Sequence, residues 1–89
     1  MGFQITNDGI LVKYTKEEGV TDAVVPDGVR KIGCCAFSGC SNLTNITIPD
    51  SVKSIGYRAF SGCMKLTSIN IPDSVVRIGA EAFSSCRSL

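Results

Sequence analysis

The cysteines are the strongest candidate nucleophiles and metal ligands in this 89-residue chain, which contains no histidine. The five cysteines are Cys34, Cys35, Cys40, Cys63 and Cys86. An odd number of thiols cannot be fully paired within one chain, and no Cys-x-x-Cys motif suggests a zinc site. We therefore expect free thiols, no metal and no other cofactor.

Catalytic patterns are also missing. Without histidine, the usual Ser–His and Cys–His pairs that activate a nucleophile are unavailable. Gly28 and Gly33 have the spacing of a phosphate-binding loop, but Cys34 stands where that motif requires lysine. The repeat pattern also produces sequons for asparagine-linked glycosylation, and these sequons by themselves do not indicate a secreted protein. The chain is predicted not to be an enzyme.

The recurring Pro-Asp dipeptides reveal an internal period of 23 residues, which lies in the roughly 20–29-residue range of leucine-rich repeats. The aspartates of these dipeptides are typical turn residues. The columns that hold one residue type in all three copies start at Pro26, Asp27, Val29, Ile32, Gly33, Ala36, Phe37, Ser38, Cys40 and Leu43.

Each copy contains an alternating apolar segment that predicts a strand. Segments 43–48 and 66–71 fit the pattern L-x-x-L-x-L, and segment 20–25 is a weaker copy. Proline follows each segment and ends its hydrogen-bonding ladder. The returning part of each unit is expected to hold a second short extended piece at Ile-Gly. A single helical or 3₁₀ turn is expected at Ala-Phe-Ser-Gly-Cys.

The residues before the first repeat predict a β-hairpin. The Asp-Gly dipeptide at 8–9, between two apolar segments, is a strong signal for a two-residue hairpin loop. Such a loop pairs Phe3 with Tyr14 and Ile5 with Val12. Tyr14 also lies one period before the first phenylalanine of the repeats, so it is expected to begin an aromatic column.

Together these features predict an α/β repeat solenoid: a short, right-handed leucine-rich-repeat solenoid with a parallel sheet and an N-terminal β-hairpin cap. Stacked units bury the columns of phenylalanine and cysteine, whereas Cys35 is expected to be exposed. The predicted organisation is a cap at 1–19 and three repeats at 20–42, 43–65 and 66–88, without a C-terminal cap.

The motifs Ile-Pro-Asp-Ser-Val, Ile-Gly and Ala-Phe-Ser-Gly-Cys, at this spacing, resemble the BspA-like leucine-rich repeats from Val20 to Leu89. The segment 8–15 is similar to the usual entry segment of that family. Longer members are typically bacterial or protozoan surface proteins that bind host proteins or other cells. The resemblance therefore implies a bacterial repeat protein that acts through protein–protein interaction.

The formal net charge of +1 predicts no nucleic-acid partner, and no apolar run is long enough to predict membrane insertion. The N-terminus has no signal-peptide pattern. The location therefore stays open: cytoplasmic if the chain is complete, and cell surface or secreted if it is a fragment.

Two surfaces are candidates for binding a protein partner. The strand residues that face away from the core form a small polar patch on the predicted concave side: Asp22, Val24, Asn45, Thr47, Ser68 and Asn70. The C-terminal end leaves apolar side chains uncovered, which allows a homodimer with two-fold symmetry. The residues of this open end are Val75, Ile78, Phe83 and Leu89.

Three functions are compatible with these features. The leading hypothesis is a non-catalytic protein-binding module whose partner is unknown. A second is a terminal structural fragment of a longer cell-surface adhesin. A third is a stand-alone inhibitor that blocks a larger bacterial enzyme or nuclease by protein–protein contact.

Overall fold

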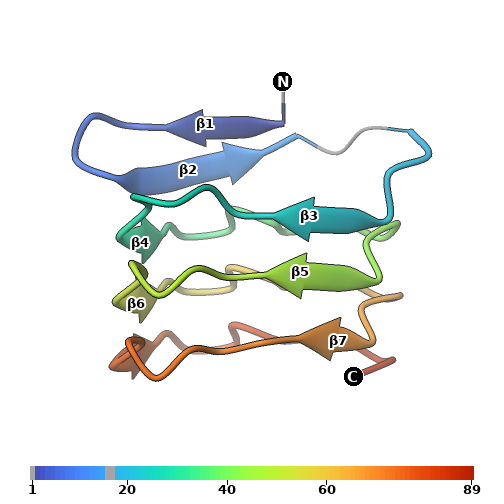
Figure 1. Cartoon of the computed structure of the whole chain (residues 1–89). Helices are drawn as coiled ribbons and strands as arrows, with labels where there is room; N and C mark the ends of the chain where they lie inside the picture. The colour runs from blue at the N-terminus through green and yellow to red at the C-terminus, as the bar shows by residue number, and fades with distance from the viewer. Residues whose placement is uncertain (1, 16–17) are drawn as a thin grey trace.

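The computed structural model describes residues 2–15 and 18–89. The described residues form eight short strands and no helix (Figure 1). The strands are β1 (Phe3–Ile5), β2 (Ile10–Tyr14), β3 (Asp22–Val24), β4 (Lys31–Ile32), β5 (Asn45–Thr47), β6 (Ser54–Ile55), β7 (Ser68–Ile69) and β8 (Arg77–Ile78).

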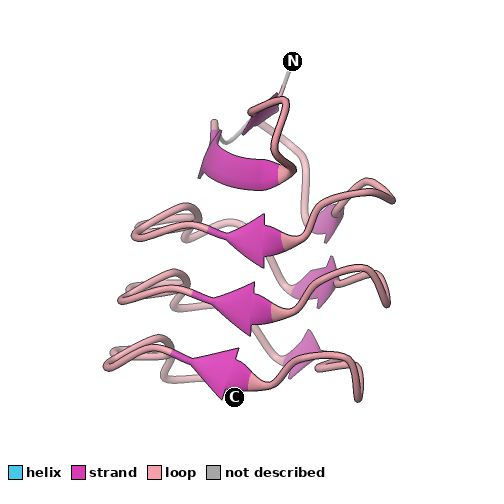
Figure 2. Cartoon of the chain, turned by 90° about the vertical axis from the view of Figure 1, so that its left-hand side faces the viewer, coloured by secondary structure: helices cyan, strands magenta, loops and turns pink. Residues whose placement is uncertain are grey.

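Every repeat contributes one strand to each of two sheets, which lie on different sides of the solenoid (Figure 2). The order in the first sheet is β3-β5-β7, with all neighbours parallel. The order in the second is β1-β2-β4-β6-β8, which is parallel from β2 onward. The predicted parallel solenoid is confirmed, and the short Ile-Gly pieces form their own ladder because each pairs with its counterpart one unit away.

The expected helical or 3₁₀ turn between the sheets is a series of hydrogen-bonded turns, in which the N–H groups of Ser38 and Cys40 donate to the carbonyl three residues back at 3.1 and 3.2 Å. Within 36–40, the N–H of Phe37 donates to the carbonyl of Ala59 at 2.7 Å, and the N–H of Gly39 donates to Ser61 at 2.8 Å. These donors bond to the next unit, so they are not available for a helical ladder along the chain. Stacking of units therefore overrides local helix formation in this segment.

The N-terminal hairpin forms, with one change from its predicted register. β1 and β2 pair antiparallel, and Phe3 lies opposite Tyr14 as predicted. The predicted pairing of Ile5 with Val12 is wrong, because the register shifts within β1 and places Ile5 opposite Leu11. β2 then pairs in parallel with β4, so the hairpin covers the first unit on the side of the five-stranded sheet.

The hairpin loop is longer than the predicted two-residue Asp-Gly loop. Thr6 and Ile10 bracket it, because the N–H of Thr6 donates to the carbonyl of Ile10 at 2.9 Å. Asn7 and Asp8 occupy the centre of a turn that the N–H of Gly9 closes onto the carbonyl of Thr6 at 3.0 Å. Gly9 has a φ of 84°, the left-handed conformation expected after the turn in a three-residue hairpin loop.

The core is a continuous aromatic stack. Ring centroids lie 5.1 Å apart between Tyr14 and Phe37, 5.1 Å apart between Phe37 and Phe60, and 5.3 Å apart between Phe60 and Phe83. Tyr14 therefore begins the column, as its position one period before Phe37 predicts. Phe37 and Phe60 are fully buried, whereas Phe83 is half-buried because it has a stacking partner on only one side.

The cysteine column packs beside the aromatic stack, and its three cysteines are in the reduced form, as predicted. Cys40 and Cys63 are buried, and Cys86 is half-buried. The Cys63 thiol donates a hydrogen bond to the carbonyl of Phe37 at 3.2 Å, and the Cys86 thiol donates to Phe60 at 3.0 Å. Burial raises the pKa of Cys63 to about 12, so this side chain is neutral at physiological pH. The column is structural.

Candidate functional site

The outer side of the three-stranded sheet carries most of the predicted polar patch. Strand register places Asp22, Asn45 and Ser68 in one column, and Val24 and Thr47 in a second. Val24 is 65% exposed, and Asn45 is the one half-buried member. Within the described chain, the side chains of these five residues, here named the β3-β5-β7 face, make no hydrogen bond or ion pair. They are free to contact a partner.

Asn70 differs from the other predicted patch residues. Its Oδ1 accepts a hydrogen bond from the N–H of Ile48 at 3.0 Å, and its Nδ2 donates to the carbonyl of Ile48 at 3.2 Å. The amide thus extends the contact between β5 and β7 beyond the end of their ladder. Because both polar atoms are already used, we do not include Asn70 in the β3-β5-β7 face.

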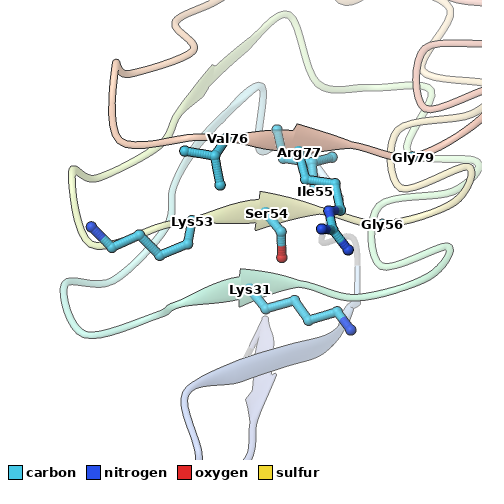
Figure 3. A pocket seen from close by; sticks show the side chains of 8 residues that line it. All are labelled: Lys31, Lys53, Ser54, Ile55, Gly56, Val76, Arg77 and Gly79. Carbon is cyan, nitrogen blue, oxygen red and sulfur yellow. The ribbon is translucent and has the colours of Figure 1, made fainter.

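The five-stranded sheet carries a groove that the sequence analysis missed. The groove has a volume of about 360 Å³, and its lining combines cationic, small and apolar residues (Figure 3). The residues that line this basic groove are Lys31, Lys53, Ser54, Ile55, Gly56, Val76, Arg77 and Gly79. The charges of the groove lie in two columns of the 23-residue period. Neither column holds the same residue type in all three repeats, so the identical columns do not reveal the groove.

The three cations of the groove have no anionic partner among residues 2–15 and 18–89. Among the described residues, the ion pair that forms lies elsewhere, between Arg58 Nη2 and Glu81 Oε1 at 2.6 Å. Lys31, Lys53 and Arg77 are all exposed. Their positive charge therefore faces solvent without being neutralised inside the described part of the protein.

The predicted open-end residues differ in their exposure to solvent. Ile78 and Leu89 are 48% and 53% exposed, whereas Val75 and Phe83 are half-buried against the core. The strands β7 and β8 each pair on one side only within the described structure. Val76, which was not predicted to belong to this end, is 82% exposed.

The two adjacent cysteines correct one prediction. Cys34 is the exposed thiol and Cys35 is half-buried, the reverse of the order expected from the repeat alignment. Cys35 has a φ of 60°, and the aligned Arg58 and Glu81 adopt φ values of 53° and 57°. This shared left-handed corner sets the direction of the side chains and brings the Sγ atoms of Cys34 and Cys35 to 3.5 Å. The hydrogen bond with Cys35 raises the pKa of Cys34.

The described residues hold no group of three or more His, Cys, Asp or Glu side chains that could bind a metal ion. In the same part of the chain, no helix has the length and apolar character needed to span a membrane. The candidate sites are three surfaces: the β3-β5-β7 face, the basic groove and the open end.

Comparisons with known proteins agree with this architecture. The model of the BspA type leucine rich repeat region, described with six copies, matches residues 13–89. Comparison with curated proteins gives no match. Among solved structures, a leucine rich repeat protein of T. pallidum is 38% identical with a TM-score of 0.81, covering 98% of this chain and 44% of that one.

Two further solved structures are similar. A leucine rich cell surface protein from Faecalibacterium prausnitzii A2-165 is 31% identical with a TM-score of 0.79, and the match covers 97% of this chain and 26% of that one. A leucine-rich repeat protein from Bacteroides ovatus ATCC 8483 is 28% identical with a TM-score of 0.70, covering 96% and 31%. The chain thus spans less than half the length of each structure. This chain belongs to the BspA-type leucine-rich-repeat family.

Proposed function

We propose that the chain is a non-catalytic protein-binding module and that its partner docks on the β3-β5-β7 face. The observation that carries this proposal is the pair of aligned columns of exposed side chains, none of which is used within the described fold. β5 pairs on both sides, and β3 and β7 each pair with β5, so parallel pairing holds the three strands in register before a partner arrives. A pre-organised surface loses less conformational entropy on binding than a flexible one.

The residue types on this face favour a protein partner. Asp22, Asn45, Thr47 and Ser68 offer short donors and acceptors, and Val24 adds one strongly exposed apolar side chain. Mixed polar and apolar contacts of this kind are typical of non-obligate protein interfaces. The near-neutral net charge of +1 does not favour a nucleic-acid partner.

The absence of histidine from the sequence supports a binding role rather than catalysis. The cysteine that is most deeply buried, Cys63, has a strongly raised pKa, which is unfavourable for a thiolate nucleophile. Leucine-rich repeats of this family also act generally as binding or structural modules.

A specific observation supports a second function, a structural segment of a longer bacterial surface protein. One similar structure is a leucine rich cell surface protein, of which the matched part covers 26%. Each unit of a solenoid contacts only its neighbours, so further units can be added at either end. Three repeats can therefore form part of a longer array. A cell-surface location belongs to this proposal.

The proposed function also includes self-association through the open end. Ile78, Leu89 and Val76 leave apolar area exposed beside the one-sided strands β7 and β8. Two copies that meet there with two-fold symmetry would cover both ends at once.

Selection from a phage-displayed library of random peptides tests the binding face. We expect the peptides enriched on the unmodified chain to lose binding to Val24→Arg and to Thr47→Arg, because arginine at either position obstructs the column that these two residues share. Met64→Arg, an exposed apolar position outside the face, is the matched control and should retain binding. Enriched peptides that bind both face variants as well as the control variant would contradict the proposal.

A further inference from the structure

We propose that the basic groove binds a short acidic segment of a protein partner, with carboxylates at alternate positions followed by an apolar side chain. This inference rests on the proposed protein-binding function and adds a second contact surface, on a different side of the solenoid from the β3-β5-β7 face (Figure 2). The register of the strands, the unpaired charges and the exposed apolar wall of the groove favour such a ligand.

Register explains why a hollow exists at this position. Lys31, Ser54 and Arg77 lie in one column on β4, β6 and β8. The long cationic side chains come from the outer two strands, and the short Ser54 lies between them (Figure 3). Gly56 and Gly79, which follow β6 and β8, line the groove with backbone alone. A Cβ at Gly56 would lie 2.9 Å from the backbone of the preceding unit, and one at Gly79 would lie 2.6 Å from it. The groove is therefore a consequence of side-chain length along a regular sheet.

The charge of the groove selects an anionic ligand. Lys53 adds a third cation immediately before β6, and none of the three cations forms an ion pair within the described chain. Neighbouring strands are about 4.8 Å apart, which puts Lys31 and Arg77 roughly 10 Å apart at their backbones. Same-side residues of an extended peptide repeat about every 6.7 Å, so flexible lysine and arginine side chains can reach two alternate carboxylates.

Two features favour a protein segment over a long polyanion such as a nucleic acid or a sulfated polysaccharide. Val76 borders the cations and is 82% exposed, so it offers an apolar contact that only a partner with apolar side chains can use. Asp27, Asp50 and Asp73 recur in the exposed turns just before the groove residues of each unit. These aspartates limit the cationic area and repel a long anionic chain that extends beyond it.

Nuclear magnetic resonance titration with synthetic peptides tests the inference. The probe peptide is Glu-Ser-Glu-Ser-Leu, which places both carboxylates and the leucine on one side when extended. We expect it to shift the amide signals of 53–56 and 76–79 at low salt, and to lose affinity as salt is added. The charge-reversed peptide Lys-Ser-Lys-Ser-Leu should not bind, and Glu-Ser-Glu-Ser-Ser should bind more weakly.

Variants of the chain locate the site. Lys53→Glu and Arg77→Glu should each weaken binding of the acidic peptide by roughly tenfold, because each replaces an attraction with a repulsion. Lys65→Glu is the matched control: it makes the same change in net charge at an exposed position outside the groove, and should bind the peptide like the parent. A thermal melt of each variant confirms that it folds.

Three outcomes would overturn the inference: equal losses in Lys65→Glu and in the groove variants, peptide-induced shifts that lie outside the groove, or heparin that displaces the peptide and binds more tightly. Failure of this peptide test would not contradict the proposed binding role of the β3-β5-β7 face. Val24→Arg and Thr47→Arg test the β3-β5-β7 face and should leave binding of the acidic peptide unchanged.

Discussion

The rings of Phe37 and Phe60 lie 5.1 Å apart at an interplanar angle of 21°, so two residues separated by one full repeat form a single stack. Phe60 continues the stack to Phe83 at 5.3 Å, which makes it the one phenylalanine with a phenylalanine on both sides. Stacked and fully buried rings of this kind contribute both apolar burial and aromatic contact to the free energy of unfolding.

Phe60→Ala should therefore strongly destabilise the fold. Removing a buried phenylalanine typically costs about 3–5 kcal/mol, which is a large part of the stability of a small domain. Phe83→Ala should cost less, since Phe83 is already half-buried. Thermal melts of the two variants check the order. A melting temperature for Phe60→Ala that equals the parent's, or a larger loss in Phe83→Ala, would show that the stack does not carry the stability.

Thiol labelling should follow the exposure of the cysteines rather than their order in the repeat. Cys34 is exposed and should react first with a thiol reagent in native buffer. Its labelling rate should rise with pH because the thiolate is the reacting form, and its raised pKa moves this rise to higher pH. Cys40 and Cys63 are buried and should react only when the protein unfolds. Mass spectrometry of digested, partly labelled protein identifies the sites. Rapid labelling of Cys63 under native conditions would mean that the cysteine column does not face the core.

Stability should decrease at alkaline pH because of Cys63. Its folded pKa of about 12 lies above the value of about 8.5 for an unfolded thiol, so folding favours the neutral form. This contribution is fully present below about pH 8.5 and is lost as pH rises toward the folded pKa. Cys63→Ser retains a donor for the carbonyl of Phe37 but does not ionise in this range. Denaturant melts from pH 7 to 10 should show a steeper loss in the parent than in this variant, and parallel curves would refute the assignment.

The polypeptide of residues 1–89 should self-associate through its open end. Light scattering over a concentration series should show a rising mean mass, and Ile78→Lys should suppress the rise because it places a charge on the exposed apolar end. Val24→Lys, on the β3-β5-β7 face, is the control and should behave like the parent. A polypeptide that stays monomeric at every concentration and binds no hydrophobic dye would exclude this interface.

Several elements of the fold could be predicted from the sequence because each follows from a repeated local pattern. The 23-residue period placed Phe37, Phe60 and Phe83 in one column, and the structure confirms that column together with Tyr14. The same period placed Cys40, Cys63 and Cys86 in a core column, of which the first two are buried and the third is half-buried. The division into a cap and three repeats stays a prediction.

The candidate surfaces could be predicted only in part. Alternation along the strands identified the exposed columns of the β3-β5-β7 face, but it could not show that the amide of Asn70 is bound to the backbone of Ile48. The basic groove was missed because its column changes residue type, from Lys31 to Ser54 to Arg77, and the change itself creates the hollow. The identical apolar columns mark the core, whereas this groove lies on a column that varies.

The sequence by itself determined the repeat, the parallel stacking and the residues of the core, because these depend on which apolar side chains recur at a constant spacing. Only the tertiary structure decided the path of the backbone between those residues. The N–H of Phe37 could have started a helical turn, but it donates to Ala59 in the next unit, and this choice exists only when two units are stacked. The same stacking sets the left-handed corner that exposes Cys34 rather than Cys35. The aligned corners of the other units have the same backbone geometry although they hold different residues, so the residue type does not determine it.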